Sequence, residues 1–155
     1  MDRFPVIVVD DHCVVRKGLT ALIEAEPDLT VVAEAATGTA ALACVAGAPA
    51  SIVILDLDLP DMTGLEVLRY LTAHHPQSRV LIFSSFPASA FSSKAFEAGA
   101  AGYLSKQSRI ASVVPTLRAM TPAWGSWSET ACRSLTVPTV DTQVSIGTRA
   151  WSALF

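Results

Sequence analysis

Five short apolar runs, rich in β-branched residues, recur along the chain and are separated by longer mixed segments. Each run is nearly continuous in apolar character, which is typical of strands that other elements cover on both faces. We therefore predict strands at residues 5–10, 30–35, 51–56, 79–84 and 101–104.

The segments between these runs have the spacing of helices. Apolar residues recur there at intervals of three and four, as at Val15, Leu19 and Leu22, and such intervals place side chains on one helix face. Gly99 is suited to a left-handed helix cap, and Pro115 should kink or shorten the last helix. Helices are predicted around residues 15–23, 38–46, 65–75, 88–98 and 109–120.

Strands that alternate with helices at this spacing predict a parallel sheet with right-handed crossovers. The expected fold class is α/β, a flavodoxin-like doubly wound (βα)5 sandwich with the sheet order 2-1-3-4-5. We expect one domain over residues 1–120. Residues 121–155 form a tail or truncated linker, rich in Thr, Ser and Pro, whose fold the pattern does not predict.

Composition narrows the class of protein. The 155 residues are 51% hydrophobic, enough for a full core, and the net charge of −3 gives no general reason to expect nucleic-acid binding. No apolar run approaches the length of a membrane span. Cys13, Cys44 and Cys132 are odd in number and lack metal-ligand spacing. We expect a cytoplasmic protein whose cysteines are small core residues.

Polar residues follow four of the predicted strands. They are the pair Asp10 and Asp11, then Asp56, Ser84 and Lys106. Because the carboxyl ends of parallel strands share one edge of a sheet, these side chains should converge there. Alone, an aspartate in such a place is more often a turn former or helix cap, and a lysine is more often solvated. The combination favours a site for a divalent metal and a phosphoryl group.

Each residue of this site has an expected role. Mg²⁺ prefers oxygen ligands, so Asp11 and Asp56 would bind it directly, Asp10 through a water, and the backbone carbonyl near Asp58 would add a ligand. Asp56 could attack phosphorus as a nucleophile. Lys106 would neutralise the phosphoryl oxygens and Ser84 would donate a hydrogen bond to one of them. His12 is interpreted as a surface residue at a helix start.

Four motifs give the chain a resemblance to a known family. It resembles the receiver domain of two-component response regulators, most closely the NarL/FixJ type, over about residues 5–106. The motifs are VVDDH at 8–12 with VRKGL at 15–19, DLDLPDMTGLE at 56–66, VLIFS at 80–84 and GAAGYLSK at 99–106.

The resemblance implies a phosphorylation-controlled switch with Mg²⁺ as cofactor. Asp56 would accept phosphate from a histidine kinase or phosphotransfer protein, Asp10 and Asp11 would bind Mg²⁺, and Lys106 would contact the phosphate. Ser84 and Tyr103 would be the switch pair, with Tyr103 rotating inward after phosphorylation. Such a protein is no enzyme in the ordinary sense, although it catalyses the gain and loss of its own phosphate.

Two other functions remain open from the residues alone. Asp56 and Asp58 resemble the Asp-x-Asp pair of aspartyl-phosphate phosphatases, although those enzymes carry the pair on their first strand. A degenerate receiver that serves only as a dimerisation module is the other alternative. For output we expect protein contact, such as a homodimer through the fourth and fifth helices, without sequence-specific DNA binding and without a membrane.

Overall fold

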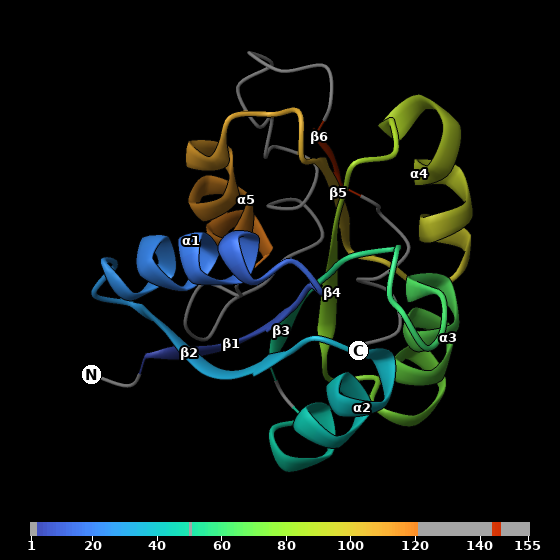
Figure 1. The fold of residues 1–155 in the computed structure, drawn as a ribbon, viewed down its shortest axis with the longest axis horizontal. Coiled ribbons are helices and arrows are strands. Elements are labelled where there is room, and N and C mark those ends of the chain that lie inside the picture. Colours follow the sequence, from blue (N-terminus) through green and yellow to red (C-terminus); the bar gives the residue numbers. More distant parts are fainter. Residues whose placement is uncertain (1–2, 50, 121–143, 147–155) are drawn as a thin grey trace, which may run out of the picture.

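The sheet has the strand order that the sequence predicts. The structure, a computed structural model, describes residues 3–49, 51–120 and 144–146. Its parallel strands lie in the order β2-β1-β3-β4-β5 (Figure 1). They comprise β1 (Phe4–Val9), β2 (Leu29–Ala35), β3 (Ile52–Leu55), β4 (Arg79–Ser84) and β5 (Gly102–Ser105).

Helices cover both faces of this sheet (Figure 1). On one face lie α1 (Cys13–Glu24) and α5 (Val113–Met120), and on the other α2 (Gly38–Gly47), α3 (Gly64–His74) and α4 (Ala88–Glu97). None of the helices within the described residues is long and apolar enough to cross a membrane.

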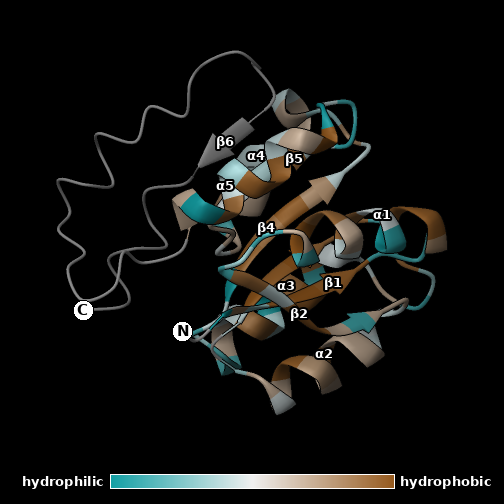
Figure 2. Cartoon of the chain, turned by 90° about the vertical axis from the view of Figure 1, so that its left-hand side faces the viewer, coloured by the Kyte–Doolittle hydropathy of each residue, from teal (hydrophilic) through white to brown (hydrophobic). Residues whose placement is uncertain are grey.

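The strands fill a core on each side of the sheet, which explains their continuous apolar character. Ile7 and Val9 pack toward α2, α3 and α4, whereas Val6 and Val8 pack toward α1 and α5. All four are at most 1% exposed. Figure 2 shows the hydrophobic colour concentrated on the strands between the helices. The doubly wound prediction is therefore confirmed.

Two local signals act as the sequence predicts. Gly99 follows α4 with φ of 108°, and a Cβ there would lie 2.3 Å from the Thr72 hydroxyl oxygen, so only glycine fits. Pro115 lies in the first turn of α5, where a missing N–H costs no helical hydrogen bond. The predicted helix is shortened as expected, because a 3-10 turn (Ile110–Ser112) precedes α5.

One further strand was not predicted. The segment β6 (Val144–Ile146) pairs antiparallel with β5 and makes the sheet six-stranded. The rest of the predicted tail lies outside the described residues.

Candidate functional site

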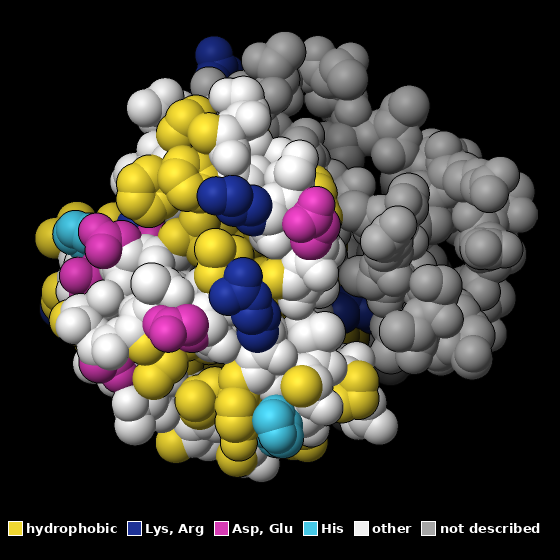
Figure 3. Space-filling model, turned by 90° about the vertical axis from the view of Figure 1, so that its right-hand side faces the viewer, with side chains coloured by type: hydrophobic (Ala, Val, Ile, Leu, Met, Phe, Trp, Pro, Cys, Tyr) yellow, Lys and Arg dark blue, Asp and Glu magenta, His cyan; other side chains and the backbone are white. Residues whose placement is uncertain are grey.

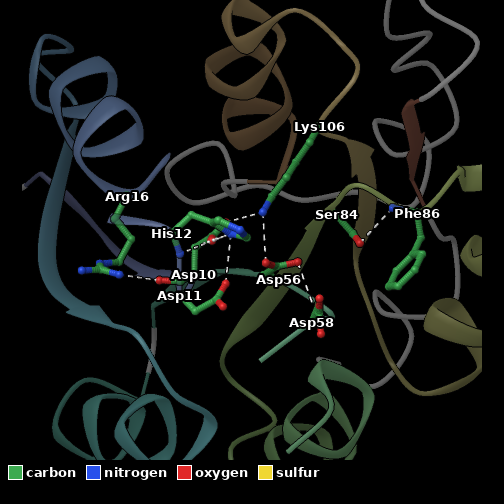
Figure 4. A network of polar contacts seen from close by, with 9 residues as sticks. All are labelled: Asp10, Asp11, His12, Arg16, Asp56, Asp58, Ser84, Phe86 and Lys106. Atoms are coloured by element: carbon green, nitrogen blue, oxygen red, sulfur yellow. Dashed lines mark hydrogen bonds and ion pairs between the residues drawn. The ribbon is translucent and has the colours of Figure 1, made fainter. Parts of the chain in front are cut away.

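The polar residues converge at one edge of the sheet, as predicted. Asp10 directly follows β1, Asp56 follows β3, Ser84 ends β4 and Lys106 follows β5. The ladder continues into the site, because the Asp56 N–H donates to the Val9 carbonyl over 3.0 Å. Figure 4 shows the carboxylates of Asp10 and Asp56 with the Lys106 ammonium directed at them.

A single ammonium group is shared by two buried carboxylates. Lys106 Nζ lies 2.6 Å from Asp10 Oδ2 and 3.0 Å from Asp56 Oδ2. Asp10 is 1% exposed and Asp56 is 3% exposed. The contact to Asp10 Oδ2 is a close ion pair. A second cation that binds this oxygen would therefore have to share it with the ammonium or displace it.

The electrostatics of this group follow from burial and charge. Burial raises the pKa of Asp56, the Lys106 hydrogen bond opposes that rise, and the charge of Asp10 adds to it. Burial would lower the pKa of Lys106, but the two carboxylates outweigh this effect and raise it. Lys106 therefore stays charged. Keeping Asp56 ionised, in contrast, lowers the stability of the folded state.

Asp11 and His12 form the exposed rim of the site. His12 Nδ1 lies 3.0 Å from one oxygen of Asp10 and 3.0 Å from one oxygen of Asp11. Its side chain is 61% exposed, so the surface location predicted for it is right, yet it contacts both acids. Arg16, one turn into α1, donates to the Asp10 carbonyl over 2.7 Å. These two contacts of His12 were not predicted, because its place beside the acids was the only signal for them.

The loop after Asp56 is held close to the strand end. The Asp58 N–H donates to Asp56 Oδ1 over 3.3 Å, while Asp58 itself is exposed. A Cβ on Gly64 would lie 2.3 Å from the Asp56 carbonyl oxygen, so this approach requires glycine. Thr63 and Glu66 form a capping box that begins α3 at this point. The loop therefore presents the backbone of Asp58, not its carboxylate, to Asp56.

Ser84 and Tyr103 meet through the backbone of Phe86. The Phe86 N–H donates to the Ser84 hydroxyl over 3.2 Å, and the Tyr103 hydroxyl donates to the Phe86 carbonyl over 2.8 Å. Tyr103 is fully buried, and burial raises the pKa of its hydroxyl. The inward position that the sequence predicts for Tyr103 after phosphorylation is thus adopted while Asp56 is paired with Lys106.

The chemistry of the donors fits a small divalent cation. Ligand atoms of Asp10, Asp11, His12 and Asp56 lie within 4.8 Å of one another. Carboxylate oxygens suit Mg²⁺, and the partly exposed rim leaves room for the waters that this ion retains. The predicted ligands Asp10, Asp11 and Asp56 are brought together. The carbonyl near Asp58 stays a prediction.

Comparison with known proteins agrees with this geometry. Residues 6–118 match the family described as the response regulator receiver domain. The chain belongs to this family. As a receiver domain of two-component signalling, it shares 43% identity over 101 residues with the DNA-binding transcriptional activator DevR/DosR of Mycobacterium tuberculosis. That match covers 65% of this chain and 46% of the activator, so the receiver spans about half of that relative.

Solved receiver structures show the same fold. A two-component response regulator of the LuxR family from Aurantimonas sp. SI85-9A1 is 40% identical, with a TM-score of 0.72 over 77% of this chain and 85% of its own. The signal receiver domain of the putative response regulator NarL from Mycobacterium tuberculosis is 29% identical, with a TM-score of 0.73 over 77% and 97%. The NarL-type likeness expected from the motifs is confirmed, and the chain is also similar to a receiver of the LuxR family.

Proposed function

We propose that Asp56 accepts a phosphoryl group from a histidine kinase or phosphotransfer protein and that Mg²⁺ is required. The observation that carries this proposal is the pair of buried carboxylates sharing the Lys106 ammonium. Burying two like charges beside one lysine is unfavourable for folding, and such an arrangement is characteristic of functional sites.

The transfer requires one bond to form and one to break. An Asp56 carboxylate oxygen bonds to phosphorus as the bond from phosphorus to the donor breaks, and its electron pair leaves with the donor atom. Lys106 compensates charge on the phosphoryl oxygens. The Ser84 hydroxyl accepts from the Phe86 N–H, so its own O–H is free to donate to the phosphoryl group. Mg²⁺, when held by Asp10, Asp11 and Asp56, would neutralise the charge that gathers there.

A small phosphodonor tests this proposal directly. Acetyl phosphate with Mg²⁺ should add the mass of one phosphoryl group to the intact chain, and chelation of the metal should prevent it. Asp56→Asn should abolish the gain, whereas the exposed neighbour Asp58→Asn should retain it. Peptide mapping to Asp58 or Asp61, or repeated turnover of a phosphate ester through Asp58, would contradict the assignment.

The face that carries α4 is the proposed contact surface for output. Figure 3 shows hydrophobic side chains gathered on it together with basic ones. Phe86 is 40% exposed and its ring lies 4.7 Å from that of Phe91, while Lys94 Nζ lies 6.0 Å from the Phe91 ring. Movement of Ser84 and Tyr103 would act on this surface through the Phe86 backbone. We propose that it serves protein contact, including the α4 part of a homodimer interface to which α5 would contribute from the other face of the sheet.

A further inference from the structure

The outer edge of β5 is occupied by a strand from the end of the same chain. Val144–Ile146 pair with β5 in antiparallel register, with Ile146 opposite Gly102, Ser145 opposite Tyr103 and Val144 opposite Leu104. The register is therefore centred on Tyr103, the residue whose hydroxyl donates to the Phe86 carbonyl.

The direction of the backbone groups follows from the neighbouring strand. The Lys106 N–H donates to the Ser84 carbonyl over 2.8 Å and so faces β4. Because backbone groups alternate along a strand, Leu104 and Gly102 face β4 as well, in agreement with the register that pairs Ser84 with Ser105, and Tyr103 faces the outer edge. Its partner in β6, Ser145, then directs its own N–H group to β5. Val144 and Ile146 direct their N–H groups away from it.

β6 also borders the compartment that encloses Tyr103. The Tyr103 ring is buried on the α4 side of the sheet, in the core cluster that includes Ala88 and Ala95 of α4. β6 contacts both α4 and β5, which form two walls of this compartment (Figure 1). The added strand thus secures the backbone of β5 at the point where Tyr103 is held inward.

We propose that docking of β6 on β5 and burial of Tyr103 are coupled, so that the C-terminal strand stabilises the inward position of the switch residue. Tyr103 is buried with β6 docked even though Asp56 is paired with Lys106. The strand and a phosphoryl group on Asp56 then favour the same state. Coupling of this kind is reciprocal, so phosphorylation should tighten β6 on β5. Only this last step rests on the proposed function.

Proline substitution in the full chain distinguishes the β6 N–H group directed at β5 from those directed away. Ser145→Pro removes the N–H group directed at β5, whereas Val144→Pro removes one directed away and serves as the matched control. Amide hydrogen exchange at Tyr103 should accelerate about tenfold or more in Ser145→Pro and stay near wild type in the control. The Leu104 amide, directed toward β4, is the internal reference.

The position of the Tyr103 ring is a second readout. The chain has two tyrosines, so 3-fluorotyrosine labelling gives two fluorine signals, and Tyr70→Phe assigns them. Tyr70 is 43% exposed and serves as the solvent-accessible reference. A soluble paramagnetic agent should broaden the Tyr103 signal in Ser145→Pro but not in wild type or Val144→Pro. If the Tyr103 ring stays shielded after its amide loses protection, the coupling is refuted; an unprotected Tyr103 amide in wild type would refute the docking.

Beryllofluoride with Mg²⁺ tests the reciprocal step. It should slow exchange at the Tyr103 amide severalfold in wild type, with no such effect in Ser145→Pro. Accelerated or unchanged exchange in a chain that demonstrably binds beryllofluoride would overturn this step. Failure to bind beryllofluoride would contradict the proposed function instead, and leaves the proline comparison intact because that comparison uses no phosphoryl analogue.

Discussion

Lys106 acts as an internal cation at the carboxylate pair. Its ammonium lies between Asp10 Oδ2 and Asp56 Oδ2, which are positions that a metal ligand set also needs. A bound Mg²⁺ and this ammonium would therefore compete for the same oxygens, and Lys106 would have to turn away from them, toward the proposed phosphoryl group, if the metal binds.

The competition predicts that Lys106→Met raises the affinity for Mg²⁺ by about tenfold, because the two carboxylates lose their internal counter-ion. Metal titration followed by backbone NMR shifts at residues 10–12 and 56–58 measures it. Lys94→Met, an exposed lysine on α4, is the control and should leave the affinity unchanged. The same Lys106 variant should respond poorly to acetyl phosphate. Weaker metal binding would show that the lysine assists the ion.

Asp56→Asn should stabilise the fold by about 1 kcal/mol at neutral pH without metal, because it removes one of two buried like charges. The pKa of Asp56 is raised in the folded state, so the folded chain binds this proton more readily than the unfolded chain. The stability that protonation contributes is present at acid pH and lost as pH rises through the folded pKa. The gain from Asp56→Asn should therefore vanish at acid pH. Urea unfolding across pH measures it, with exposed Asp58→Asn as the control.

The residues that the sequence identified are those whose place is set by strand ends. Asp10, Asp56 and Lys106 follow buried apolar runs, so the parallel topology alone brings them together. His12 could not be identified in this way, since an exposed histidine at a helix start carries no pattern that distinguishes a contact with two acids. The inward Tyr103 depends on its side-chain rotamer and on the Phe86 carbonyl, neither of which periodicity encodes.

At the scale of elements, all five parallel strands lie where the apolar runs predict them, because strands buried on both faces leave a continuous signal. β6 was missed because it has only three residues and is defined by its pairing with β5, a long-range contact that local spacing does not report. The shortened α5 was predicted because the effect of Pro115 is local.

The turn that begins α3 should not tolerate a side chain at Gly64. Gly64→Ala places a Cβ 2.3 Å from the Asp56 carbonyl oxygen and 2.6 Å from Leu57 Cα, both in the backbone, so the loop must shift. We expect a loss of about 3 kcal/mol in the free energy of unfolding and slower phosphorylation of Asp56. Gly47→Ala, at the end of α2, meets nothing within 4 Å and is the control. Equal effects in urea unfolding would contradict the close approach.

For the whole molecule, we predict that this chain does not bind duplex DNA sequence-selectively, even when phosphorylated. Its net charge is −3, and the residues after Lys106 carry four arginines and no lysine against Glu129 and Asp141. So few positive charges, spread over 49 residues of sequence, give no reason to expect a surface that tracks phosphates. Fluorescence anisotropy with the phosphorylated chain should show no difference between duplex sequences. Salt-sensitive, sequence-selective binding would overturn the prediction.

The added strand has a further consequence, for solubility. All four residues of β5 are buried, and an uncovered edge of such a strand is a template for pairing with another molecule. β6 competes for that edge at an effective concentration fixed by its tether, whereas a second molecule competes in proportion to the protein concentration. Release of β6 would therefore expose the chain to edge-to-edge aggregation that grows with concentration and that dilution suppresses.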